Sequence, residues 1–139
     1  MLEILRKTLR ARAVFGGFVT ASICVGGGLL LALGIGKLFD WTNDGRSRLA
    51  FVFGIAGFLL GGFRAGLLHP PAPLANGAAA ALVAYGPLGI GQRLLAGKQL
   101  HPLSLIFAAL LAASFGVFGG LVANNANRTR AKQRLHDSL

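Results

Sequence analysis

Long apolar runs separated by short polar stretches make up most of the chain. Four such runs lie at Ala13–Leu38, Leu49–Leu68, Leu74–Ala96 and Leu103–Ala123. Each approaches or exceeds the roughly 20 residues that an α-helix needs to cross the hydrocarbon core of a bilayer. The runs are continuous and do not alternate between apolar and polar positions, so they lack the strand pattern of a membrane barrel. The pattern therefore predicts an all-α membrane protein with four transmembrane helices.

The polar stretches between the runs are short and contain turn-forming residues. The first is Phe39–Arg48, with Asn43-Asp44-Gly45 inside it, and the last is Gly97–Pro102. The middle one, His69–Pro73, holds three prolines, which remove backbone donors and restrict the residue before them. Short connections make consecutive helices antiparallel neighbours, so we expect a compact up-down bundle. Pro87, inside the third run, is expected to kink that helix.

Composition supports a lipid environment for this chain. Only 13% of its 139 residues are charged and 54% are hydrophobic, whereas a soluble domain has about 25% charged residues. The net charge is +10, a value that in a soluble protein points to nucleic acid. Here the basic residues cluster at the two ends of the chain, as charge flanking membrane spans does. Nucleic-acid binding is therefore not expected.

The distribution of Lys and Arg predicts the orientation. With both termini inside, nine of these residues lie on the inner side and five on the outer side, which places the termini in the cytoplasm by the positive-inside rule. The inner residues are Arg6, Lys7, Arg10, Arg12, Arg64, Arg128, Arg130, Lys132 and Arg134. The outer ones are Lys37, Arg46, Arg48, Arg93 and Lys98. A multi-pass protein of a bacterial plasma membrane is the expected class.

The two terminal segments are basic. Residues 1–12 carry Leu2, Leu5 and Leu9 at helical spacing with basic residues between them. This segment is either an amphipathic lead-in, drawn to the anionic lipids of the inner leaflet, or an extension of the first helix. Residues 124–139 are expected to form a helix end followed by a solvated basic cytoplasmic tail.

Small residues recur four apart within the spans, in the small-xxx-small pattern that lets membrane helices approach closely. The clearest examples are Gly57, Gly61, Gly62, Gly66, Ala112, Gly116 and Gly120. These stripes pack the four helices within one chain, or at least one of them serves an oligomer or partner interface. The second span carries small residues on two faces, which favours the intermolecular alternative.

Residue types that perform chemistry are sparse. No His, Cys, Asp and Glu stand together at metal-ligand spacing, and no nucleophile has a neighbouring base, so we expect neither a cofactor nor an enzyme. The single cysteine, Cys24, lies within the first span. No carboxylate lies within any run, unlike the small multidrug antiporters, and the Thr-Thr-Phe-Ser motif of fluoride channels is absent. A small pore or carrier, holin-like or a lipid-flippase helper, remains an alternative, but the polar residues are too few to line a pathway.

Polar residues concentrate in one stretch, FRAGLLHPPAPLANG, at the second connection. Most of it reads as a turn, in which Arg64 extends to the inner headgroups and Asn76 helps to cap the next helix. Arg64, His69 and Asn76 are the candidates for a contact with a lipid headgroup or a partner on the cytoplasmic side.

The region GGFRAGLLHPPAPLANGAAAALVAYG resembles a group of small four-span membrane proteins of unknown role in Gram-positive bacteria of actinobacterial type. Those proteins have a glycine-rich second span that ends in a basic residue, and a polar-Gly pair that opens the third span. In this chain the pair is Asn76-Gly77, where the group has His-Gly. The resemblance implies no activity. With the small-residue stripes, it leads us to expect a non-catalytic membrane protein that binds itself or another membrane protein.

Overall fold

The computed structural model describes residues 9–39, 43–90 and 101–136. In these ranges the chain forms the α-helices α2 (Ala11–Leu38), α3 (Asn43–Leu68), α4 (Pro73–Tyr85) and α6 (Pro102–His136). A short π-helix, η1 (Gly86–Ile90), continues α4. No strand occurs among the described residues.

Four helical segments are long and apolar enough to cross a membrane, as the hydropathy pattern predicts. They are Ala11–Leu38, Arg48–Leu68, Pro73–Ile90 and Pro102–Arg134. Most of their large side chains point outward: Phe15, Ile23 and Leu30 of α2 are 66%, 70% and 73% exposed. A surface of this kind is favourable in hydrocarbon and costly in water. The core is made instead of small residues, among them Ala21, Ala65, Ala80, Ala84 and Ala123, all fully buried.

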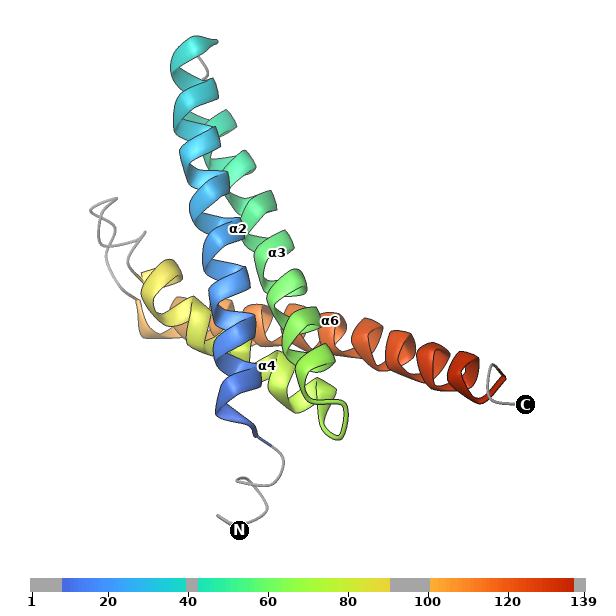
Figure 1. The fold of residues 1–139 in the computed structure, drawn as a ribbon. Helices are drawn as coiled ribbons and strands as arrows, with labels where there is room; N and C mark the ends of the chain where they lie inside the picture. Colours follow the sequence, from blue (N-terminus) through green and yellow to red (C-terminus); the bar gives the residue numbers. More distant parts are fainter. Residues whose placement is uncertain (1–8, 40–42, 91–100, 137–139) are drawn as a thin grey trace.

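The helices form two antiparallel hairpins that cross each other (Figure 1). In the first, α2 and α3 run side by side, with Gly16 against Leu68 near one end and Gly28 against Phe53 further along. In the second, α4 and α6 run in opposite directions, with Pro73 against Gly120 and Ala81 against Gly116. Chain direction therefore alternates from helix to helix.

The arrangement differs from the compact up-down bundle expected from the short connections. α4 and α6 run across the first hairpin. The C-terminal half of α2 and the N-terminal half of α3 project beyond them (Figure 1). The glycines of α3 and α6 meet over a short distance, between residues 59–66 and 116–123. Close approach over so short a stretch allows helices to cross steeply, whereas a bundle needs contact along the whole helix length.

The connection at Phe39–Arg48 is shorter than predicted because α3 begins at Asn43. Asn43-Asp44-Gly45 therefore lies in the first turn of the helix and not in a loop. Residue types that favour turns are also common at helix N-termini, so the sequence signal fitted both structures.

The third span changes its helical form at the predicted position. The α-helix ends at Tyr85 and a π-helix follows over Gly86–Ile90, with Pro87 inside it. Proline has no N–H to donate, and its ring clashes with the carbonyl group of the residue four positions earlier in a helix. The regular hydrogen-bond pattern is therefore interrupted there. The rest of the predicted span, residues 91–96, lies outside the described residues.

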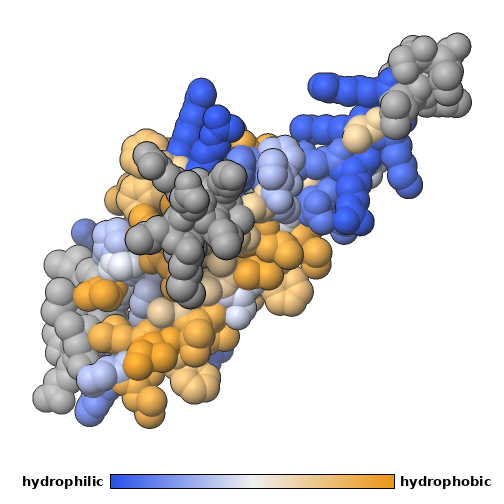
Figure 2. All heavy atoms as spheres, turned by 90° about the horizontal axis from the view of Figure 1, so that it is seen from below, coloured by the Kyte–Doolittle hydropathy of each residue, from blue (hydrophilic) through white to orange (hydrophobic). Residues whose placement is uncertain are grey.

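The C-terminal segment is more regular than predicted, because α6 continues as one helix to His136. Residues 121–136 contain neither Gly nor Pro, and half of them are Ala, Arg, Lys or Gln, which favour helix. Hydrophilic side chains gather at this end of the molecule (Figure 2), where Arg128, Arg130, Lys132 and Arg134 are all exposed. Of the predicted lead-in, residues 1–8 lie outside the described ranges, and α2 begins at Ala11.

Candidate functional site

The two hairpins meet at three glycines, one from each of three helices. Gly62 of α3 and Gly77 of α4 both lie directly against the carbonyl oxygen of Gly116 in α6. A methyl group on Gly116 would contact the Gly77 carbonyl oxygen and lie 2.7 Å from Cβ of Ala81. No side chain larger than hydrogen fits at any of these three positions without movement of a backbone. We call Gly62, Gly77 and Gly116 the glycine crossing.

A second close contact lies one turn further along α3 and α6. A methyl group on Gly66 would lie 2.7 Å from Cβ of Ala123, and one on Gly120 would lie 2.5 Å from the carbonyl oxygen of Pro73. The same three helices therefore meet twice in succession. Two contacts in sequence fix the angle between the hairpins as well as their separation.

The other face of α3 packs against α2. A methyl group on Gly57 would lie 2.6 Å from Cγ2 of Val25, and one on Gly61 would lie 2.7 Å from the carbonyl oxygen of Gly17. Ala112 of α6 is also buried, with 2% exposure. The seven small residues singled out from the sequence are thus all buried within the chain, and the two small faces of α3 contact α2 and α6.

Asn76 connects the two hairpins through hydrogen bonds and is fully buried. Its side-chain Oδ1 accepts the backbone N–H of Arg10 at 3.0 Å, and its Nδ2 donates to the carbonyl oxygen of Ala72 at 2.8 Å. Arg10 is the N-cap residue of α2, so Asn76 supplies an acceptor at the start of a different helix. The expectation that it caps its own helix is not met: Ala72 is the N-cap of α4 and Pro73 follows it.

The three residues proposed as a headgroup or partner contact do not form one exposed patch. Arg64 is exposed on the surface of α3. His69 is only 8% exposed, and its Nε2 has no hydrogen-bond partner among the described residues. Since His69 and Asn76 are both buried, and Asn76 is also hydrogen-bonded within the chain, only Arg64 of the three is exposed to a ligand.

Most hydroxyl groups within the spans bond to their own helix. Thr20 donates to the carbonyl oxygen of Gly16 at 2.9 Å, and Ser114 donates to that of Leu110 at 2.8 Å. Such bonds satisfy a hydroxyl in lipid without a partner helix. Cys24 makes a longer contact, from Sγ to the carbonyl oxygen of Phe53 at 3.9 Å. These groups do not form a continuous polar lining.

Two buried hydroxyls in the spans have no hydrogen-bond partner among the described residues, those of Ser22 and Tyr85. Tyr85 is the last residue of α4, next to the π-helix, and its ring lies directly against Gly89. Neither residue stands out in the sequence, because a lone Ser or Tyr in an apolar run carries no spacing signal.

No group of three or more His, Cys, Asp or Glu side chains that could hold a metal ion occurs in the described ranges. The expectation that the protein has neither cofactor nor catalytic activity stays a prediction.

The geometry defines a class: a multi-pass helical membrane protein in which two hairpins cross at glycine contacts. Comparison with known proteins adds no narrower assignment. No protein-family model matches the chain, and neither the curated proteins nor the solved structures include a significant match.

Proposed function

We propose that this is a non-catalytic integral membrane protein that acts through helix–helix contacts in a bacterial plasma membrane. It serves as an accessory or assembly subunit of a membrane complex, or as a homo-oligomer. The glycine crossing gives the chain a rigid internal frame, and a separate surface is left for a partner.

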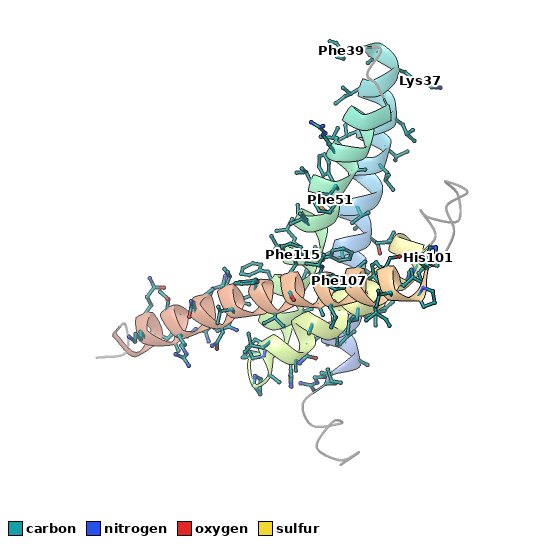
Figure 3. The ribbon with its side chains drawn as sticks, turned by 180° about the vertical axis from the view of Figure 1, so that it is seen from behind. Lys37, Phe39, Phe51, His101, Phe107 and Phe115 are labelled. Atoms are coloured by element: carbon teal, nitrogen blue, oxygen red, sulfur yellow. The ribbon has the colours of Figure 1, made fainter. Side chains whose placement is uncertain are left out.

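The observation that carries this proposal is a set of glycines that no helix covers. Among the described residues, no atom lies within 4 Å of the position that a Cβ would take on Gly26, Gly27, Gly34 or Gly54. They lie on α2 and α3, and we call them the open glycines. Figure 3 shows the hairpin running on to Lys37 and Phe39, far from α4 and α6.

Open glycines in a membrane helix need an explanation. Glycine inside a helix is less stable than alanine by roughly 0.5–1 kcal/mol, and lipid tails gain nothing from its absent side chain. Gly27 and Gly34 are seven residues apart, which is about two helical turns, so they share one side of α2. Another membrane helix can approach the backbone closely along that side, in the way that α3 approaches α2.

The orientation is part of the same proposal. α2 and α4 begin at the end of the molecule where α3 finishes and where α6 continues into its basic segment. Arg10, Arg12 and Arg64 belong to this end, which we call the basic end, and the basic residues of α6 lie further along that helix (Figure 1). The positive-inside rule places the basic end in the cytoplasm, next to the anionic inner leaflet.

Two variants on the open side of α2 and one lipid-facing control test the proposal. Gly27→Leu and Gly34→Leu leave the internal contacts intact and are expected to insert and fold, yet to reduce the mass of the complex extracted in mild detergent. The affected species is identified by mass spectrometry of the purified tagged chain. Leu110→Ala, on the exposed surface of α6, is the control and is expected to leave the complex unchanged. Recovery of wild-type protein only as a monomer would overturn the proposal.

A further inference from the structure

A shallow groove lies on the outside of the molecule between the start of α2 and the outer side of α4. Its volume is about 760 Å³, within the range of sites that hold small organic molecules. The residues that line it are Leu9, Ala11, Arg12, Val14, Phe15, Phe18, Ala79 and Val83. Only one of them, Arg12, is polar.

The apolar part of the groove faces lipid. Phe15 and Phe18 lie one turn apart on α2, with their ring centroids 6.2 Å apart and the rings tilted by 39°. Val83 of α4 is 51% exposed. Since α2 and α4 are both membrane-spanning helices, the groove opens sideways toward hydrocarbon, and its chemistry suits an acyl chain.

The charge lies at one end of the groove. Arg12 is part of the lining and is exposed; Arg10, two residues earlier, is also exposed but is not among the lining residues. The described ranges contain one acidic residue, Asp44. It is in the first turn of α3, at the opposite end of the first hairpin from Arg12, so no described carboxylate lies near Arg12. The two guanidinium groups therefore lack an acidic partner within the described structure.

We propose that the groove binds one acyl chain of an anionic phospholipid whose phosphate pairs with Arg12. Arg12 and Phe18 are six residues apart, which is about 9 Å along a helix axis, so the groove holds the upper part of the chain just below the headgroup. Arginine recognises phosphate through paired N–H donors. A zwitterionic headgroup brings its own cation to the same place, so it binds less well.

The test uses the full chain, purified in neutral detergent. Phosphatidylglycerol or phosphatidylcholine with identical acyl chains is added, and retained lipid is counted by native mass spectrometry. Preferential retention of phosphatidylglycerol is expected, and Arg12→Gln is expected to reduce it roughly fivefold, as for the loss of one basic contact at a membrane surface. Arg130→Gln, on the exposed end of α6, makes the same change in charge and is expected to leave retention unaltered.

The groove itself is tested separately. Ala79→Trp places a large ring within it and is expected to reduce phosphatidylglycerol retention, with the lipid-free melting temperature unchanged. Equal retention of the two lipids would overturn the proposal. So would an equal loss in Arg130→Gln, which would indicate diffuse attraction to the basic residues, or full retention in Ala79→Trp. Should Ala79→Trp melt at a lower temperature, Val83→Trp fills the same groove from the next turn of α4 and is judged by the same criterion.

Discussion

Replacement of Gly116 by alanine tests the glycine crossing most sharply. The added methyl group would lie against the Gly77 carbonyl oxygen and 2.7 Å from Cβ of Ala81. Carbon atoms in contact are normally about 3.5–4.0 Å apart, so α4 would have to move away by about 1 Å. The neighbouring contact between Gly120 and Pro73 opposes this movement.

Overpacking of this kind costs about 1–3 kcal/mol, which corresponds to a roughly 5- to 150-fold fall in the ratio of folded to unfolded protein. Gly54→Ala provides a matched control for stability, because no atom of the described part of the chain lies within 4 Å of the added methyl group. Its expected effect has the opposite sign, a gain of about 0.5–1 kcal/mol from helix propensity.

Unfolding in mixed micelles with increasing SDS, followed by circular dichroism, measures both variants on one scale. The expected order of stability is Gly54→Ala first, then wild type, then Gly116→Ala. If Gly116→Ala equals the wild type, or if the two variants lose the same stability, the crossing does not have the packing described above.

Three further changes test separate parts of the structure. Asn76→Ala removes the acceptor of the Arg10 N–H and is expected to lower the free energy of unfolding by about 1–3 kcal/mol. Amide hydrogen exchange should become faster at the start of α2. Asn125→Ala, at an exposed site, should change neither the free energy of unfolding nor the exchange rate. Tyr85→Phe removes a buried hydroxyl without a partner in the described structure and is expected to raise stability by about 1–3 kcal/mol; a fall in the SDS midpoint would instead assign the hydroxyl a partner. A fluorescent or enzymatic reporter at either terminus is expected to report a cytoplasmic location, and a periplasmic or extracellular signal would reverse the assigned orientation.

The four spanning helices were predictable because hydropathy depends on local composition alone. A run such as Leu103–Ala123 has few other structures open to it once it is in lipid. The crossing of the two hairpins was not predictable in the same way. Small residues four apart show that a helix can approach another closely, but they do not say which helix or at what angle.

The same limit explains why the sequence favoured an intermolecular contact for at least one of the small-residue stripes over packing within the chain. One face of small residues on α3 would be enough for packing within a four-helix chain, so the second face suggested a contact with another protein. In the structure Gly57 and Gly61 meet α2, while Gly62 and Gly66 meet α6. The open glycines carry no stripe pattern that sets them apart in the sequence, and only their surroundings identify them.

Asn76 shows how a long-range contact changes the meaning of a local signal. Its position after the prolines fitted a cap for its own helix, and its actual partner is the N–H of Arg10, which is 66 residues earlier. The polar stretch around it was recognised as a group, yet burial separates Asn76 and His69 from Arg64. Local sequence gives residue type and spacing, whereas exposure depends on the packing of all four helices.

Site-specific photo-cross-linking in intact membranes tests the proposed role most directly. A photoreactive residue in place of Gly27, on the uncovered side of α2, is expected to join the chain to a second membrane protein, either another copy or a different partner. The same residue in place of Leu110, which is 61% exposed on α6, serves as the lipid-facing control and is expected to give no such product. If the two positions give the same products, and these contain only the single chain, the proposed role is contradicted.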